Sequence, residues 1–168
     1  GATEYTDKVG DGAGVFKSND RGNSWTQINN GLDSLETNIL TVDPNDSETL
    51  YLGTDDDGVY KSTDGGESWK KLTVSSLSKS FGVGDIIVDP QNSNNIYIGT
   101  VDYFRLSESR GVLGDFGVYK STDGGATWEE FNVGLNHLGV FSLELSEENR
   151  ILYAGTRAGG VYWISLDN

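Results

Sequence analysis

One short motif occurs three times in this chain of 168 residues and constrains its fold more than any other feature. The clearest copy has the sequence GVYKSTDGGESW and spans residues 58–69. It is repeated almost unchanged at 117–128, in a looser form at 14–25, and as a remnant at 160–167. The serine of the motif falls at positions 18, 62, 121 and 165, so the period is about 44 residues with one longer step. Such a period indicates a repeat architecture.

Each copy lies among four short segments whose sequences are typical of β-strands. In the middle repeat these segments are 39–42, 50–54, 58–62 and 68–72. Clusters of Asp, Asn, Pro and Gly separate them, and such clusters form tight turns. A period of about 44 residues with four antiparallel strands in each unit matches one blade of a β-propeller.

The sequence therefore predicts an all-β fold, a β-propeller of four-stranded antiparallel blades, of which this chain holds two complete and two incomplete ones. We assign residues 1–168 to a single propeller segment. The approximate blades are 1–32 (partial), 33–75, 76–135 and 136–168 (partial). Fewer than four full blades cannot close into a ring, and open strand edges invite unwanted pairing. We expect the rest of a longer propeller, or another subunit, to complete it.

The polar residues of the motif have a structural explanation. An aspartate at a turn accepts hydrogen bonds from the backbone N–H groups that follow it, and glycine tolerates the positive φ angles that tight turns need. The tryptophan offers a large apolar surface that we expect to wedge between blades. The positions with this role are Ser18, Asp20, Gly22, Trp25, Ser62, Asp64, Gly66, Trp69, Ser121, Asp123, Gly125 and Trp128.

This pattern, Ser-x-Asp-x-Gly-x-Ser/Thr-Trp, resembles the Asp-box, or BNR repeat, of sialidases, xyloglucanase-type glycoside hydrolases and sortilin-type receptors. The resemblance covers essentially the whole chain. It implies a propeller in which the Asp-box forms the turn between the third and fourth strands, at the periphery of the blade and away from an active site. The motif is therefore expected to carry no activity itself.

Composition excludes several classes of partner. The formal net charge is −14, which disfavours binding to nucleic acid or to an anionic membrane surface. No apolar run is long enough to span a membrane. The chain has no Cys, and its acidic, Gly-rich composition favours an extracytoplasmic location: secreted, periplasmic or at the cell surface. We predict no cofactor.

Meander topology places the Asp-boxes at one end of the blades and the irregular loops at the other. Loops on a rigid scaffold are where binding concentrates. The longest is an insertion at 101–116, which either binds a ligand or covers a neighbouring blade. The predicted binding residues at this end are Asp57, Asp102, Tyr103, Phe104, Arg105, Arg110, Asp115 and Arg157, with Glu108 beside them in the insertion.

These residues favour a non-catalytic propeller that binds a protein or a glycan. The alternative is part of a glycoside hydrolase acting on a polysaccharide, which needs two carboxyl groups that face each other across a sugar. Nothing in the sequence pairs two carboxylates in that way, and we assign no catalytic residue. A sialidase also needs three converging arginines, and the Arg-Ile-Pro motif of that class is absent. A purely architectural component is a third possibility.

We predict no metal site. The cluster Asp55, Asp56 and Asp57 is a weak candidate for calcium, because hard cations prefer carboxylates, but it lacks the spacing of an EF-hand loop. His137 is the only histidine, so a site with several histidines is impossible.

Overall fold

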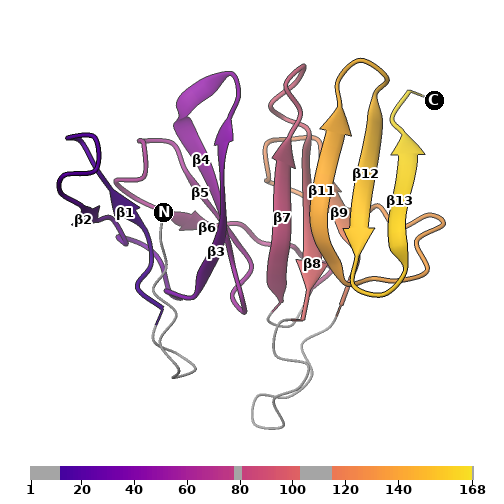
Figure 1. The fold of residues 1–168 in the computed structure, drawn as a ribbon, viewed down its shortest axis with the longest axis horizontal. Coiled ribbons are helices and arrows are strands. Elements are labelled where there is room, and N and C mark those ends of the chain that lie inside the picture. Colours follow the sequence, from indigo (N-terminus) through magenta and orange to yellow (C-terminus); the bar gives the residue numbers. More distant parts are fainter. Residues whose placement is uncertain (1–11, 78–80, 103–114, 168) are drawn as a thin grey trace, which may run out of the picture.

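The computed structural model describes residues 12–77, 81–102 and 115–167, and these residues form thirteen strands and no helix. The strands make four antiparallel sheets that follow one another along the chain and stand side by side (Figure 1). The all-β prediction with four-stranded blades is confirmed. In the part of the chain that the structure describes, no helix is long and apolar enough to cross a membrane.

The four sheets are numbered in chain order. The first sheet contains β1 (Phe16–Lys17) and β2 (Thr26–Gln27). The second contains β3 (Thr37–Asp43), β4 (Asp46–Thr54), β5 (Val59–Ser62) and β6 (Lys70–Lys71). The third contains β7 (Gly82–Val88), β8 (Ile96–Val101), β9 (Val118–Ser121) and β10 (Glu129–Glu130). The fourth contains β11 (Val140–Ser146), β12 (Ile151–Thr156) and β13 (Gly160–Ser165).

Every sheet is a meander, because its hydrogen-bonding order follows the sequence. The first strands of neighbouring sheets contact one another, β3 with β7 and β7 with β11. These strands begin earlier than the sequence predicts, at Thr37, Gly82 and Val140. Each starts with a register shift, so the apolar alternation that marks a strand is interrupted at its first residues.

The apolar core lies between the sheets and uses both faces of each one. On β5, Val59 belongs to a cluster shared with the third sheet, whereas its neighbour Tyr60 belongs to a cluster shared with the first. Both side chains are fully buried. This follows from the alternation of side chains along a strand, which sends successive residues to opposite faces. Stacked blades therefore need apolar residues at consecutive positions of a strand. A sheet with one solvent-exposed face needs them only at every second position.

Of the motif tryptophans, Trp69 packs between two sheets. Trp69 is 5% exposed and lies with Val15, Leu52 and Tyr60, and its indole N–H donates a 2.8 Å hydrogen bond to the carbonyl of Ile28 in the first sheet. The corresponding Trp25 is 56% exposed. The burial of this residue type therefore depends on the neighbouring sheet and not on the motif alone.

The Asp-box turn is closed by its own side chains. In the middle copy, the Ser62 hydroxyl donates to Asp64 at 2.7 Å and accepts from the Gly66 N–H at 2.9 Å. Asp64 also accepts from the Ser68 N–H and hydroxyl at 2.9 and 2.5 Å. These bonds, the Ser68 hydroxyl first, lower the pKa of Asp64 to about 2. Gly65 and Gly66 have φ angles of 67° and 90°, as a left-handed turn requires.

A lysine on β1 and another on β5 tie the first and second sheets to the Asp-box of the sheet that follows. The Lys17 ammonium donates to the Gly65 carbonyl at 3.2 Å, and Lys61 does the same to Gly124 at 3.1 Å. The repeat therefore encodes contacts between blades as well as the fold of each blade.

The remnant at 160–167 differs from a true Asp-box. Ile164 pairs with Leu152 on β12, at the place where Ser62 pairs with Leu50 on β4. Ser165 lies one residue further along the strand than the box serine, so an interpretation of Ser165 as a fourth copy of that serine is wrong. An extra residue in Tyr162-Trp163-Ile164-Ser165, compared with Tyr60-Lys61-Ser62, causes the shift.

Candidate functional site

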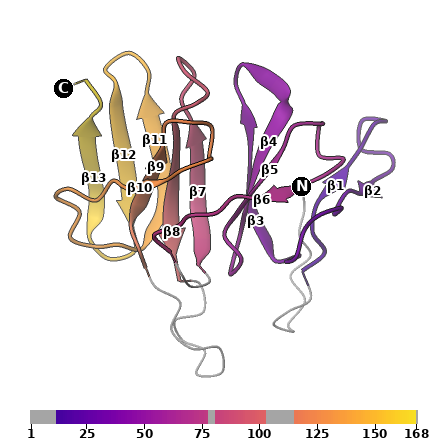
Figure 2. The same ribbon diagram turned by 180° about the vertical axis from the view of Figure 1, so that it is seen from behind.

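The two ends of the sheets differ in regularity, as the topology predicts. The turns that join β3 to β4 and β7 to β8 lie at the same end as the Asp-boxes. There the Gly65 N–H donates to the Glu48 carbonyl at 2.9 Å, and the Gly124 N–H donates to Asn94 at 3.0 Å. The C-terminal ends of β4, β8 and β12 lie at the opposite end (Figures 1 and 2). We call this opposite end the loop face. Its described residues are 33–36, 55–58, 102, 115–117, 137–141 and 157–159.

A threonine at the end of each second strand fixes the backbone of the loop face. The hydroxyls of Thr54, Thr100 and Thr156 donate to the carbonyls of Gly58, Gly117 and Gly160 at 2.9 to 3.0 Å. The same hydroxyls accept backbone N–H bonds from the loops at 2.9 to 3.1 Å. Repeated Gly-Thr pairs in the sequence carry this signal. These clamps hold the loops in place, so the side chains that the loops carry are positioned by a rigid scaffold.

Three carboxylates gather on the loop face of the second sheet. The Asp55 N–H donates to the Glu36 carbonyl at 2.9 Å, and Asp56 accepts from the Ser34 hydroxyl at 3.0 Å. Burial, and then the nearby charges of Glu36 and Asp56, raise the pKa of Asp55 to about 6. Desolvation and like charges both disfavour the ionised form. Below about pH 6 such a carboxyl group is mostly protonated and can act as a donor to a ligand.

Asp57, which the sequence predicts as a binding residue, is engaged inside its own blade. It accepts hydrogen bonds from the Tyr60 hydroxyl and from the Lys71 ammonium. Burial, and then the hydrogen bond to Asp57, raise the pKa of Tyr60. The carboxylates of Asp56 and Asp57 therefore accept hydrogen bonds from different partners. Across the described ranges, no three His, Asp or Glu side chains come together in a way that could hold a metal ion.

Three other predicted residues come together where the third and fourth sheets meet. The Asp102 N–H donates to the Asp115 carboxylate at 2.8 Å, and the Arg157 guanidinium donates to the Asp102 carbonyl at 2.5 Å. Arg157 also lies over the ring of Phe141, 5.1 Å from its centroid. That ring is 40% exposed. With a cation over one face of the ring, this place offers a ligand both a positive charge and an apolar surface.

Several residues of the loop face escaped the sequence prediction. Phe141 lies on β11 and Glu36 directly precedes β3, and the repeat motif does not distinguish their side chains. Outside the loop face, Asp85 on β7 also escaped it: this carboxylate accepts the N–H groups of Ile86 and Leu143, each at 2.8 Å, and so joins β7 to β11. Burial raises the pKa of Asp85 despite these bonds. Only the position of Asp85 at the register shift of β7 marks it as a contact residue, and strand register cannot be read from the sequence.

The remaining predicted residues, Tyr103, Phe104, Arg105, Glu108 and Arg110, lie outside the described residues. His137 lies against the β12–β13 turn, where a Cβ built on Gly159 would meet its ring at 2.2 Å. It is a packing residue of that turn.

One known protein with a similar sequence is a xyloglucanase. The chain is 36% identical over 96 residues to the xyloglucanase Xgh74A of Acetivibrio thermocellus. The aligned region is 52% of this chain and only 11% of that protein. This chain thus spans about a tenth of the length of the curated relative.

Solved structures give the same picture for the fold. An ancestral GH74 enzyme superposes with a TM-score of 0.71 at 25% identity, over 90% of this chain and 20% of that one. The GH74 enzyme of Niastella koreensis superposes with a TM-score of 0.64 at 28% identity, over 90% and 24%. The sheets are thus arranged like a part of these larger structures. A model of the family described as sortilin, neurotensin receptor 3, matches residues 13–162, and the chain therefore belongs to the Sortilin-Vps10 family.

Proposed function

We propose that this segment belongs to an extracytoplasmic propeller that binds a neutral polysaccharide of the xyloglucan type through the loop face. The ligand class is taken from the xyloglucanase with 36% identity. The observation that carries the proposal is the combination of carboxylates and an arginine-backed aromatic ring at this end. Asp55, Asp56 and Asp115 offer acceptors or a donor for sugar hydroxyls, and the Phe141 ring offers an apolar surface. Binding sites generally combine an apolar surface with a few polar groups that fix orientation.

The Asp-box end supports the proposal by contrast. There the carboxylates of Asp20, Asp64 and Asp123 accept bonds from the hydroxyls and N–H groups of their own turns. Their acceptor capacity is used to close the turn.

A second candidate is a glycoside hydrolase in which this segment forms part of the cleft wall. The observation in its favour is the pKa of Asp55, which burial raises to about 6. A general acid must be protonated near the working pH, and glycosidases use such a carboxyl group with a second carboxylate across the sugar. On this hypothesis Asp55 would be the acid, and the partner carboxylate would come from elsewhere in the longer protein.

The test is binding of xyloglucan to the full-length protein by isothermal titration calorimetry. Phe141→Ala is expected to weaken binding by about tenfold, corresponding to the loss of about 1.4 kcal/mol. Trp25→Ala is the matched control, because it also removes an exposed aromatic ring, but one that belongs to an Asp-box. Equal loss in both variants, or no binding by the unmodified protein, would contradict the proposal.

Hydrolysis separates the two candidates. Release of reducing ends from xyloglucan that is abolished by Asp55→Asn, while binding remains, would identify an enzyme. Binding without release of reducing ends would identify a binding protein. Asp57→Asn is a control for general damage to this loop, because Asp57 is held by Tyr60 and Lys71.

A further inference from the structure

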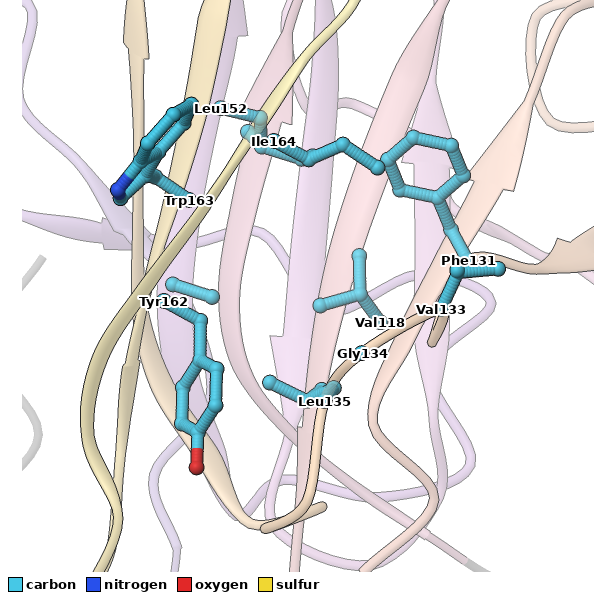
Figure 3. Close-up of a pocket in the computed structure, with 10 residues that line it drawn as sticks. Val118, Phe131, Val133, Gly134, Leu135, Leu152, Tyr162, Trp163 and Ile164 are labelled. Atoms are coloured by element: carbon cyan, nitrogen blue, oxygen red, sulfur yellow. The ribbon is translucent and has the colours of Figure 1, made fainter.

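An apolar pocket lies between the third and fourth sheets, next to β13 (Figure 3). Its volume is about 120 Å³. Its lining comes from β9, from the segment after β10, and from β12 and β13, and it includes Val118, Phe131, Leu135, Leu152, Ala154 and Tyr162. The pocket is at a different place from the loop face, so a role for the pocket is independent of the proposed polysaccharide binding.

The repeat identifies what fills the same place elsewhere in the molecule. Strand register makes Leu152, Ala154 and Tyr162 the counterparts of Leu50, Leu52 and Tyr60. Their position relative to the motif tryptophan makes Val118, Phe131 and Leu135 the counterparts of Val15, Ile28 and Leu32. Those six counterparts are the residues that surround Trp69 between the first and second sheets. The pocket is thus the equivalent of the Trp69 site.

Two glycines provide a second, independent observation. Gly31 has a φ of 91°, and a Cβ built on it would come within 2.1 Å of the carbonyl oxygen of Trp69. Its counterpart, Gly134, has a φ of 80° and meets no atom of the described residues within 4 Å. The glycine conformation that receives the backbone of the tryptophan strand is therefore present in both places. Next to Gly134, Val133 is 91% exposed.

The edge of β13 completes the comparison. In the second and third sheets, a fourth strand pairs with the third one, β6 with β5 and β10 with β9. Within residues 12–77, 81–102 and 115–167, β13 pairs with β12 alone. Val161 and Trp163 on this strand are 70% and 67% exposed. An exposed strand edge with apolar side chains is a template for pairing with another strand.

We propose that this edge binds an Asp-box strand from another propeller segment, in which a tryptophan follows serine or threonine. The strand pairs antiparallel with β13 as its fourth strand. Its indole fills the pocket, donating to the carbonyl of Phe131 as Trp69 donates to that of Ile28. Its backbone passes over Gly134. Recognition thus combines main-chain hydrogen bonds with one deep aromatic anchor, a common arrangement for added strands.

The test uses a fluorescein-labelled synthetic peptide with the sequence of residues 62–74, which contains the Asp-box and Trp69. Binding to the chain is measured by fluorescence anisotropy. We expect saturable binding, and at least about a tenfold loss when the peptide tryptophan is replaced by alanine. Equal affinity of the two peptides, or no binding at about 1 mM peptide, overturns the proposal.

Variants of the chain locate the site. Gly134→Val places a side chain where the peptide backbone is expected, and it should abolish binding. Val133→Ala next to it keeps the passage open and should retain binding. Because Gly134→Val also strains a positive φ, its thermal unfolding is measured beside that of Gly134→Ala, which shares most of that strain with less bulk.

Discussion

Arg150 and Asp89 form a bidentate ion pair between the fourth and third sheets, with nitrogen–oxygen distances of 2.9 and 2.6 Å. The Asp89 side chain is 1% exposed and that of Arg150 is 15% exposed. Burial by itself raises the pKa of Asp89, but the bonds from Arg150, Gln91 and Asn95 outweigh it and hold the pKa below its usual value. This pair joins the end of β7 to the β11–β12 turn, so it sets how the two sheets sit against each other.

Replacement of Arg150 by alanine should destabilise the chain by about 3–5 kcal/mol, because it leaves a buried carboxylate without its cation. The measurement is the free energy of unfolding in urea. Arg21→Ala is the matched control, since Arg21 and Arg150 both have positive φ angles, 60° and 49°, but Arg21 is exposed. The difference between the variants isolates the ion pair from the backbone effect. Similar values for both would contradict a role of the pair.

Trp69→Ala should cost about 3–5 kcal/mol in the free energy of unfolding, because it empties a packed site between two sheets. Trp25→Ala removes the same residue type from the same motif position, where it is 56% exposed, and should cost well under half as much. Chemical denaturation of both variants measures this. A large loss for Trp25→Ala would mean that the indole acts within its own turn and not between sheets.

The hydrogen bonds to the Asp-box aspartates should stabilise the folded chain at every pH except in strong acid. Hydrogen bonds from Ser68 and Ser62 lower the pKa of Asp64 to about 2, and bonds from Thr127 and Ser121 do the same for Asp123. The folded pKa lies below the unfolded value of about 3.9, so this stabilisation is complete above about pH 4 and is lost as the pH falls toward 2. Asp64→Asn should make the urea midpoint of unfolding change less with pH in this range.

The control for this titration is Glu67→Gln, which removes an exposed carboxylate from the same turn. It should leave the loss of stability between about pH 4 and 2 unchanged. If Glu67→Gln flattened the curve as much as Asp64→Asn, general charge repulsion and not the box hydrogen bonds would explain it.

Asp55 should titrate near pH 6, since burial and the charges of Glu36 and Asp56 oppose its ionisation. The folded pKa lies above the unfolded value of about 3.9, so the protonated form favours folding and stability decreases as the pH rises from about 4 to 6. Carboxyl carbon NMR shifts measure the pKa directly. Glu36→Gln should lower the pKa by removing a like charge, whereas Ser34→Ala should have a smaller effect. A pKa of Asp55 near 4 in the unmodified chain would contradict the buried position.

Part of the candidate site could be predicted from the sequence, and the rest could not. Loop position, which follows from meander topology, predicts Asp102, Asp115 and Arg157 at one end of the blades, and the structure brings these three together. It also predicts Asp57, but it does not reveal that Tyr60 and Lys71 hold that carboxylate. Phe141 and Asp85 depend on the register between sheets, which no local pattern records.

The sequence by itself determined the unit of this fold. Period, turn residues and alternating apolar positions are local properties, so they specify four short strands and a serine–aspartate turn without any knowledge of the neighbours. Only the tertiary structure decided what each copy does. Trp69 is buried, Trp25 is exposed, and the pocket at Phe131 holds no side chain of the described residues, because burial depends on whether another sheet stands opposite. The same physical reason raises the pKa of Asp55, since that pKa depends on the charges and the desolvation that neighbouring loops supply.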